Sequence, residues 1–333
     1  MNILVCGGAG FIGSAFIRNT LKNNSDSNIT NLDLLTIGSN LKNLKDIDNF
    51  SNYKFIKDDI RNESIIDSLV KNTDVIINFA AESHVDRSIA NPKPFLDTNI
   101  LGTYSILEAT RKFDKQFIHV STDEIYGDAY GQSSFDENSQ INPSNPYAAT
   151  KAAADHLVSS YHRTYGINCI TTRCTNNFGP NQFPEKLIPK TIIRSIKNLK
   201  IPLYGDGMQI RSWIYVNDHA KAIENLISKG KPGNVYNITA YEEITNKTIV
   251  EKILDILEKP YSMIEHVGDR PGHDKRYSIN CSKIENEIGW KYQYNFDDAL
   301  KQTVTWYLDN QSWWEPLIDE NTLHPQPWTI NSK

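Results

Sequence analysis

The sequence predicts an α/β protein with a Rossmann-type doubly wound parallel sheet and a smaller α/β substrate-binding lobe toward the C-terminal end. Three observations predict this fold. Short apolar runs typical of buried strands alternate with helical stretches along the first half of the chain. A glycine-rich turn joins the first apolar run to the first helix. After residue 178 the composition changes, because prolines at positions 180, 184, 189 and 202 interrupt the alternation.

The composition is that of an ordinary globular protein and argues against several classes of function. Of the 333 residues, 39% are hydrophobic and 23% are charged, and the formal net charge is -5. An acidic chain is a poor partner for nucleic acid. No apolar run is long enough to span a membrane, and the amino terminus enters a strand pattern without a basic segment and a cleavage site. We therefore expect a cytoplasmic protein that binds neither nucleic acid nor membrane.

The four cysteines show no spacing typical of a metal site. Cys6, Cys169 and Cys174 lie in or beside predicted buried strands, and Cys281 stands alone. We interpret them as small core residues and expect neither disulfides nor a structural metal.

The first element pair is a strand over residues 2–6 and a helix over residues 14–23, joined by glycines. Gly7, Gly10 and Gly13 fit the spacing G-x-x-G-x-x-G, and position 8 in place of 7 gives G-x-G-x-x-G. Such glycines permit a tight turn and close approach of the backbone to a pyrophosphate, which then faces the positive end of the helix dipole. Between a strand and a helix, this turn predicts a dinucleotide-binding site.

The next two strands bring acidic residues to the predicted site. Asp33 follows the strand at residues 28–32, twenty residues after the last glycine of the turn. A carboxylate there can accept both adenosine ribose hydroxyls and repels a 2′-phosphate, so it selects NAD over NADP. Asp59 and Ile60 follow the strand at residues 53–56, where they can flank an adenine.

The fourth strand, residues 74–79, ends in small residues. Ala80 and Ala81 would let the backbone approach the cofactor closely. A long helix is expected over residues 95–113, and it contains Thr98.

The stretch Ser121 to Gly127 follows an apolar strand over residues 115–120. It places the hydroxyl of Thr122 and the carboxylates of Asp123 and Glu124 at one strand end. In open α/β sheets ligands bind outside the carboxyl ends of the strands. The stretch is therefore a candidate for acid–base chemistry.

A helix that starts near Pro146 carries Tyr147 and Lys151, which lie on one helix face. A lysine ammonium close to a tyrosine hydroxyl stabilises the phenolate, so we expect it to lower the tyrosine pKa toward the working range. The pair can then act as a general base on an alcohol.

The chain divides into two predicted lobes. Residues 1–178, with a returning segment at about 212–240, form the predicted NAD-binding domain. Residues 179–211 and 241–333 form the predicted nucleotide-sugar-binding lobe.

Together these features resemble the extended short-chain dehydrogenase/reductase superfamily, and within it the dTDP-glucose 4,6-dehydratase family. The resemblance covers the chain from Met1 to about Tyr277. The stretches that carry it are residues 80–88, 122–124, 177–180, 183–189, 204–207 and 270–274. The acid pair after Thr122 separates dehydratases from sugar epimerases, which usually lack it.

Two stretches depart from the family pattern. The chain has Arg211-Ser212-Trp213 where the family usually has Arg-Asp-Trp, in the part that faces the substrate. It has Thr36-Ile37-Gly38-Ser39-Asn40-Leu41 where the family usually has Thr-Tyr-Ala-Gly-Asn-Leu, near the adenosine. The first departure bears on the nucleotide base and the sugar, whereas the second should matter less.

The resemblance implies dehydration of dTDP-glucose to dTDP-4-keto-6-deoxyglucose, on the way to rhamnose. Tyr147, assisted by Lys151, would take the C4 hydroxyl proton while hydride passes from C4 to NAD. Glu124 would take the C5 proton, and a protonated Asp123 would donate to the departing C6 hydroxyl. Thr122 would bond the C4 oxygen. Burial and like charge should push the two carboxyl pKa values apart.

The resemblance also implies binding residues and a partner. The cofactor would be lined by Gly7, Gly10, Phe11, Ile12, Gly13, Asp33, Asp59, Ile60, Ala80, Ala81, Thr98, Tyr147, Lys151 and Asn177. The nucleotide sugar would be held by Ser83, Thr122, Asn176, Lys186, Leu187, Tyr204, Arg211, Asn246, Arg270 and His273. The two arginines suit a diphosphate, although salt bridges are their alternative role. The helices over residues 95–113 and 147–165 would form a four-helix bundle in a homodimer, or their apolar positions would only pack on the sheet.

Other functions remain open. A UDP-sugar 4-epimerase or decarboxylase shares the glycine turn and Tyr147 with Lys151 but has no use for the acid pair. A dehydratase of another nucleotide sugar, UDP-glucose or UDP-N-acetylglucosamine, is not distinguished by these motifs. A non-catalytic NAD-sensing regulator on the same fold would tend to lose the tyrosine or the lysine.

Overall fold

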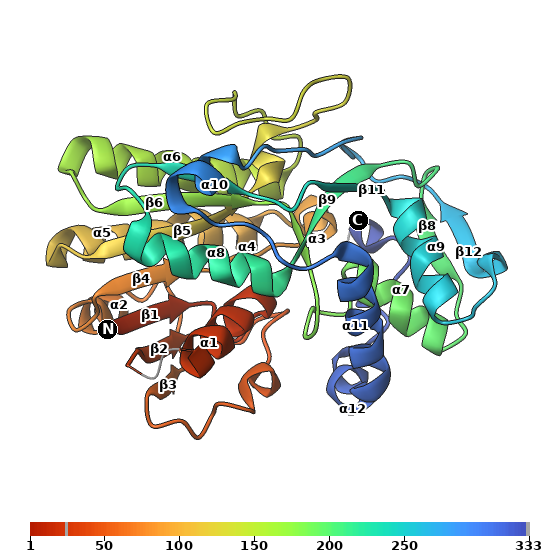
Figure 1. Ribbon diagram of the computed structural model, residues 1–333, viewed down its shortest axis with the longest axis horizontal. Coiled ribbons are helices and arrows are strands. Elements are labelled where there is room, and N and C mark those ends of the chain that lie inside the picture. The colour runs from red at the N-terminus through yellow and green to blue at the C-terminus, as the bar shows by residue number, and fades with distance from the viewer. Residues whose placement is uncertain (24–25, 331–333) are drawn as a thin grey trace.

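The protein is described by a computed structural model that covers residues 1–23 and 26–330. Its centre is a seven-stranded sheet with the order β10-β6-β5-β4-β1-β2-β3, in which every adjacent pair is parallel (Figure 1). The strands are β1 (Asn2–Cys6), β2 (Asn28–Leu32), β3 (Tyr53–Ile56), β4 (Val75–Asn78), β5 (Gln116–Thr122), β6 (Cys169–Cys174) and β10 (Val235–Ile238). This strand order is that of a doubly wound Rossmann sheet extended at one edge, and it confirms the predicted fold class.

Helices cover both faces of this sheet. One face carries α1 (Phe11–Asn23), α8 (Val216–Lys229) and α10 (Ser282–Ile288), and the other carries α2 (Glu63–Val70), α5 (Thr103–Phe113) and α6 (Pro146–Tyr165). Side chains alternate along β1, so Ile3 and Val5 join the core of the first face while Leu4 and Cys6 join that of the second. Because both faces are buried, the strands are mostly apolar, although β6 has Thr171, Thr172 and Arg173 in its interior.

The second lobe lies beyond the carboxyl ends of the sheet strands, to the right in Figure 1. It contains the sheet β11-β9-β7 and the parallel pair β12-β8. Its elements are β7 (Asn176–Phe178), α7 (Leu187–Ile196), β8 (Ile201–Tyr204), β9 (Ile210–Tyr215), β11 (Glu242–Thr245), α9 (Asn246–Ile256), β12 (Ile264–Val267), α11 (Phe296–Asp309) and α12 (Gln311–Trp314). Its core is aromatic, with Phe178, Trp213, Tyr307 and Trp314 all buried.

Short elements complete the chain in both lobes and between them. The helical ones are α3 (Val85–Ala90), α4 (Lys93–Phe95), a π-helix (Leu96–Gly102) and 3-10 turns at Leu41–Leu44, Asp123–Tyr126, Tyr261–Met263, Glu315–Leu317 and Pro327–Thr329. The long helix expected over residues 95–113 is therefore divided, because a π-helical segment separates α4 from α5. Gly102 ends that segment and packs against the side chain of Ile60, since a Cβ atom there would lie 2.3 Å from Ile60 Cδ1.

The turn at Leu203 to Gly207 connects β8 to β9, which do not pair with each other. Gly207 N donates to Tyr204 O over 3.0 Å, which makes a tight turn, but β8 then pairs in parallel with β12. The following strand, β9, pairs with β7 and β11 instead. The return to the main sheet consists of α8 and β10, and α10 also packs against them.

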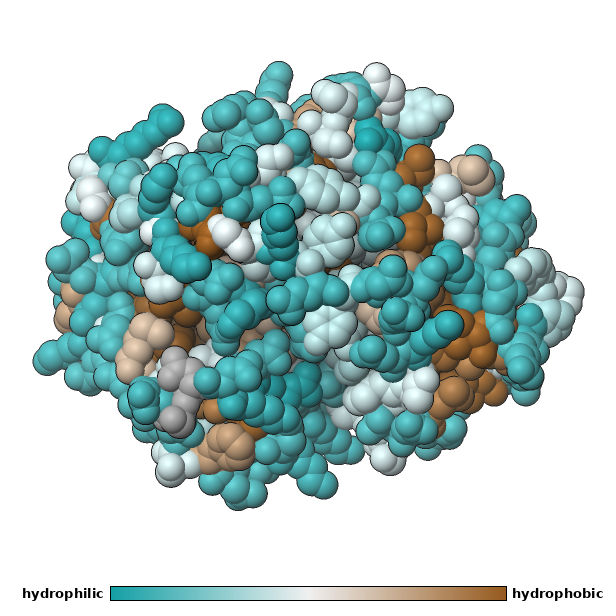
Figure 2. All heavy atoms as spheres, in the orientation of Figure 1, coloured by the Kyte–Doolittle hydropathy of each residue, from teal (hydrophilic) through white to brown (hydrophobic). Residues whose placement is uncertain are grey.

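The visible surface in Figure 2 is mostly hydrophilic, with apolar residues gathered in separate patches. Among the described residues, no helix has the length and apolar character needed to cross a membrane. All four cysteines are buried and free, as expected of core residues.

Candidate active site

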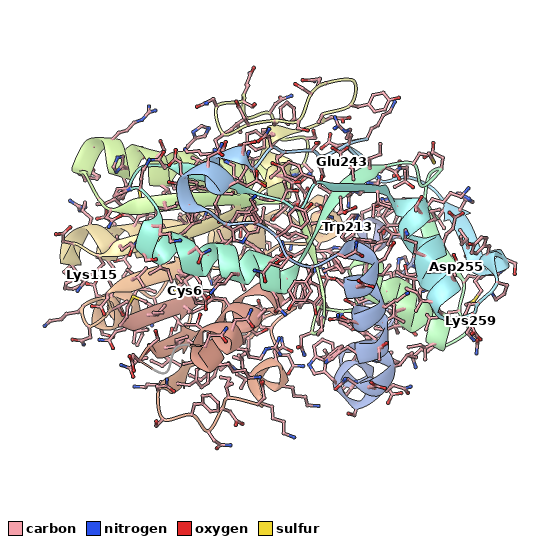
Figure 3. The ribbon with its side chains drawn as sticks, in the orientation of Figure 1. Cys6, Lys115, Trp213, Glu243, Asp255 and Lys259 are labelled. Atoms are coloured by element: carbon pink, nitrogen blue, oxygen red, sulfur yellow. The ribbon has the colours of Figure 1, made fainter. Side chains whose placement is uncertain are left out.

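One cleft runs along the carboxyl ends of the parallel strands and reaches the second lobe. Every residue predicted to bind the dinucleotide lines this cleft, and so do all five predicted catalytic residues. Trp213, labelled in Figure 3 at the junction of the two lobes, also lines it. The edge of the sheet where ligands bind in doubly wound folds is therefore the edge that carries the predicted chemistry.

The glycine turn has the form that a pyrophosphate requires. Gly7 has a φ of +78°, and a Cβ atom there would lie 2.5 Å from Ala80 N. A Cβ atom on Gly13 would lie 2.4 Å from Gly7 O. Helix α1 begins at Phe11, so its positive end faces the cleft. These positions accept glycine alone, and the resulting cradle fits a dinucleotide.

Asp33 is buried at the end of β2, and backbone amides hold its carboxylate. Ala9 N donates to Oδ2 over 2.9 Å and Leu35 N donates to Oδ1 over 2.8 Å. Burial raises the Asp33 pKa, whereas hydrogen bonds from Leu35, Ser39 and Ala9 oppose the rise. Ser39 stands where the resembling family usually has glycine, so sequence reasoning underestimated this position.

Asp123 is the buried member of the acid pair. Thr122 caps the 3-10 turn that follows β5, and its hydroxyl lies 3.3 Å from Asp123 Oδ1 and 3.3 Å from Glu124 N. Burial, reinforced by the nearby Glu124, raises the Asp123 pKa to about 8, and Arg211 opposes this. Asp123 Oδ2 has no hydrogen-bond partner among the described residues. At neutral pH Asp123 is therefore a protonated acid.

Glu124 is half-buried and reaches a different environment. Asn145 Nδ2 donates to its Oε2 over 3.4 Å, and Tyr277 Oη lies 3.4 Å from the same oxygen but donates to Asp274 Oδ2 over 2.7 Å. Asn145 is also the N-cap of α6, where its Oδ1 accepts from Ala148 N. Sequence reasoning missed both residues. Asn145 carries a signal in the sequence, because an asparagine directly before a proline that starts a helix is typical of an N-cap.

Tyr147 and Lys151 lie on the first turns of α6, both buried. Lys151 Nζ donates to Val120 O over 2.7 Å, and burial lowers the Lys151 pKa to about 8. The pKa of Tyr147 is raised well above its ordinary value, first by burial and then by Glu124, and a hydrogen bond with Thr122 opposes the rise. The expected lowering of the Tyr147 pKa by Lys151 is therefore wrong for this structure, because burial dominates and the ammonium bonds a carbonyl.

The predicted substrate residues fall into two groups. Those that line the cleft are Ser83, Thr122, Asn176, Lys186 and Leu187. Tyr204, Arg211, Asn246, Arg270 and His273 lie outside that lining. Asn246 is the first residue of α9, where its N–H donates to Gln209 O.

The remaining members of the outer group form a polar layer beside the acid pair. The guanidinium of Arg211 lies 4.1 Å from the ring centre of Tyr277, and its Nη2 donates to Asp274 O. His273 Nδ1 lies 2.6 Å from Asp269 Oδ1. Sequence reasoning had assigned no role to Tyr277, Asp274 or Asp269.

The departure at Ser212 leaves the lining of the cleft intact. Side chains alternate along a strand, so Ser212 of β9 points to the opposite face of its sheet from Arg211 and Trp213. Trp213 lines the cleft, and its indole N–H has no partner among the described residues.

The fold and this cleft define a dinucleotide-dependent enzyme of the short-chain dehydrogenase/reductase type. A family model described as GDP-mannose 4,6 dehydratase matches residues 4–303. A dTDP-glucose 4,6-dehydratase from Streptomyces niveus is 45% identical over 98% of each chain. The chain belongs to the dTDP-glucose 4,6-dehydratase family, within the broader group that the family model describes.

Solved structures agree with this relationship. A dTDP-glucose 4,6-dehydratase from Bacillus anthracis in complex with NAD is 44% identical, with a TM-score of 0.90, and the match covers 96% of this chain and 100% of that one. The corresponding enzyme from Streptomyces venezuelae, with NAD and a dTDP ligand bound, is 42% identical, with a TM-score of 0.94 and the same coverage.

Proposed function

We propose that this chain dehydrates dTDP-glucose to dTDP-4-keto-6-deoxyglucose with NAD as a cofactor that is regenerated in each turnover. The observation that carries the proposal is the environment of the acid pair. Burial raises the Asp123 pKa to about 8, while Glu124 is half-buried and accepts a hydrogen bond from Asn145. One site thus offers an acid and a base on adjacent residues. The relatives of the chain support the same reaction and cofactor.

The cofactor site fits NAD by its own chemistry. The turn at Gly7 and Gly13 would hold the pyrophosphate, and Asp33 would accept the adenosine ribose hydroxyls. When bound, NAD supplies a hydride acceptor for C4 and later a hydride donor for C6. The protein residues supply all of the proton transfers.

The first proton transfer opens the reaction at C4. Tyr147 takes the proton of the C4 hydroxyl, and Thr122 holds the C4 oxygen in place through its hydroxyl. Because burial raises the Tyr147 pKa, the phenolate needs stabilisation by nearby positive charge. Lys151 provides an ammonium one helical turn away, with two N–H groups beyond the one bonded to Val120 O.

The second stage removes water across C5 and C6. The 4-ketone acidifies the C5 hydrogen, and Glu124 takes that proton as a general base. Asp123 donates its proton to the C6 hydroxyl, which leaves as water. Glu124 then returns its proton to C5 as hydride reaches C6. Asp123 thus acts as the acid and Glu124 as the base of this stage.

The proton balance requires a return path within the protein. Each turnover leaves Tyr147 with one proton more and Asp123 with one proton fewer. The Thr122 hydroxyl is hydrogen-bonded to both of these side chains. It can accept a proton from Tyr147 and pass its own proton to Asp123, which restores both groups without exchange with bulk water.

The alternatives make different use of these residues. A UDP-sugar 4-epimerase or decarboxylase needs Tyr147 and Lys151 but neither acid. A regulator has no need of Tyr147, Lys151 and the acid pair in one cleft. A dehydratase of UDP-glucose or UDP-N-acetylglucosamine would use the same chemistry, so substrate identity has to be measured.

The site assignments, the lobes and the assembly are further parts of the proposal. The lobe formed by residues 1–175 with 216–240 and α10 binds NAD, and the rest of the chain binds the nucleotide sugar. The expected bounds at 178 and 212 shift because β7 and β9 pair within the second lobe, and α10 packs on the main sheet. We also propose a cytoplasmic homodimer. Exposed large side chains on the π-helix, α5 and α6 support it, because Leu101, Tyr104 and Tyr165 are 53%, 41% and 52% exposed.

The test is conversion of dTDP-glucose by the purified protein. After alkali treatment, 4-keto-sugar absorbance is measured, with UDP-glucose as the parallel substrate. We expect signal from dTDP-glucose and its loss in Glu124→Gln. Signal from UDP-glucose alone would keep the mechanism and change the substrate. Interconversion of UDP-sugars without keto-sugar would favour an epimerase and contradict the role of the acid pair.

A further inference from the structure

The segment Val85 to Ser88 contributes to the family resemblance but has no role in the chemistry above. In the structure it opens α3, a helix of six residues between the two lobes. Ser88 Oγ accepts from Tyr147 N over 3.2 Å, at the start of the catalytic helix. Arg87 Nη2 lies 2.7 Å from Glu185 Oε1, next to the cleft residue Lys186. One short helix thus bonds to two separate parts of the site.

Asp86 adds a third connection, to the second lobe. Its Oδ1 accepts from Arg270 Nη1 and its Oδ2 accepts from Tyr204 Oη, each over 2.9 Å. The Asp86 side chain is only 3% exposed. A buried carboxylate is costly unless it is paired and hydrogen-bonded, and here both oxygens are engaged by residues far away in the sequence.

The contact with Asp86 holds Arg270 in place but leaves some of its hydrogen-bond donors without a partner. Asp86 engages Nη1, while Nε is buried and has no hydrogen-bond partner among the described residues. The side chain is 14% exposed. A buried N–H without a partner is unfavourable, and a guanidinium fork matches the oxygens of a phosphate. The free donors of Arg270 therefore point to an anionic ligand.

Tyr204 is held from two sides. Its hydroxyl bonds Asp86, and its ring packs edge-on against Trp328 with 4.7 Å between ring centres. The 3-10 turn Pro327–Thr329 that carries Trp328 packs against α3. The hydroxyl of Tyr204 thus has little freedom to choose another partner.

We propose that α3 acts as a bracket, meaning that it fixes the position of the diphosphate-binding side chain of Arg270 relative to the catalytic helix α6. Asp86 is the positioning residue of this bracket. Asp86 orients Arg270 toward the substrate diphosphate, the Tyr204 hydroxyl holds Asp86 in place, and Ser88 connects the same helix to Tyr147. This inference rests on the proposed function, because the diphosphate of dTDP-glucose is the ligand that Arg270 receives.

The test is Asp86→Asn in the full-length protein, with dTDP binding measured by titration calorimetry. Loss of the fixed geometry should weaken dTDP binding by about 10- to 100-fold, the range for hydrogen bonds to charged groups. With dTDP-glucose, KM should rise by a similar factor and kcat should change less than threefold, roughly the uniform-binding pattern. A charge effect alone predicts the opposite, since removing a carboxylate beside Arg270 would strengthen binding of a diphosphate.

Two variants separate positioning from stability. Asp218→Asn removes another buried carboxylate, which accepts from Gln293 N and Tyr294 N on the opposite side of the main sheet. It should lower Tm but leave dTDP affinity unchanged. Tyr204→Phe removes only the second partner of Asp86 and should weaken dTDP binding even if Asp86→Asn fails to fold.

A double-mutant cycle completes the experiment. In an Arg270→Lys background, Asp86→Asn should weaken dTDP binding by a further factor of less than about three, because Asp86 then has no guanidinium to orient. If both Asp86→Asn and Tyr204→Phe bind dTDP as tightly as the unmodified protein, the bracket is wrong while the proposed function stands. If the unmodified protein binds dTDP but does not convert dTDP-glucose, the proposed reaction fails and the binding data still test the bracket. If it does not bind dTDP, both fail.

Discussion

The hydroxyl of Thr122 lies 3.3 Å from Asp123 Oδ1, and the same hydroxyl is hydrogen-bonded to Tyr147. This places one proton-carrying group between the residue that gains a proton in the proposed cycle and the residue that loses one. Neither Tyr147 nor Asp123 has ready access to water, since both are buried. The return of the proton is thus a step that the local geometry can either permit or prevent.

Thr122→Val should slow repeated turnover more than the first turnover. The substitution keeps the shape of the side chain but removes the hydroxyl, so Tyr147 and Asp123 must exchange protons with solvent separately. Rapid-quench measurements of keto-sugar should show a burst followed by a steady-state rate reduced by about 10²-fold or more. Thr122→Ser, which keeps the hydroxyl, should show no burst. Equal slowing of both phases in Thr122→Val would mean that Thr122 only orients the C4 oxygen.

The pH dependence of kcat/KM should report Asp123, because kcat/KM reflects the ionisations of the free enzyme. Burial raises its pKa to about 8, so the protonated form that donates to the C6 hydroxyl is present below that pH. The value of kcat/KM for dehydration should fall as pH rises through about 8, and the fall should be absent from the residual activity of Asp123→Asn. A profile that instead rises through pH 8 would assign the titration to the general base.

The raised pKa of Asp123 should also make the stability of the folded protein fall as pH rises. The Asp123 pKa is about 8 in the folded state against an ordinary value of 3.8. Folding therefore takes up a proton between these two pH values, and the contribution of this group falls by about 1.4 kcal/mol per pH unit as pH rises between them. Asp123→Asn lacks this dependence. The Tm of Asp123→Asn minus the Tm of the unmodified protein should therefore be larger at pH 8 than at pH 5, as measured by calorimetry at both pH values. An equal Tm difference at the two pH values would contradict a raised Asp123 pKa.

Local patterns were sufficient to predict the first lobe. The predicted strands at residues 2–6, 28–32 and 53–56 coincide with β1, β2 and β3. An apolar run bounded by a glycine turn or an acidic loop identifies a buried strand without knowledge of its neighbours. The second lobe depends on long-range pairing. β8 pairs with β12 about sixty residues later, and no local pattern in the sequence indicates that pairing.

The candidate site divides in the same way. The run from Thr122 to Glu124 is contiguous, so its chemistry is visible in the sequence. Asp86, Asn145 and Tyr277 reach the site only through tertiary contacts, and no local pattern indicates which partner each will meet. The pKa of Tyr147 was misjudged for the same reason, because its burial is set by the whole fold.

Asp33→Asn should change the choice of cofactor. The substitution keeps the size of the side chain and one acceptor for the amides of Ala9 and Leu35, but it removes the charge that repels a 2′-phosphate. The ratio of NAD to NADP affinity should fall by about 10-fold or more, as measured by titration of cofactor-stripped protein. An unchanged ratio would show that another group reads the adenosine ribose.

Leu101→Glu should convert the proposed homodimer to monomers. Leu101 is 53% exposed at the end of the π-helix, beside Tyr104 of α5, so a charge there would have to be buried against a second copy. Leu199→Glu is the matched control, because Leu199 is 41% exposed but follows α7 in the second lobe. Sedimentation velocity should show a dimer for the unmodified protein and for Leu199→Glu, and a monomer for Leu101→Glu. If Leu199→Glu alone dissociates the protein, the interface lies on the second lobe. If all three proteins sediment as monomers, the apolar surface of α5 and α6 has another purpose.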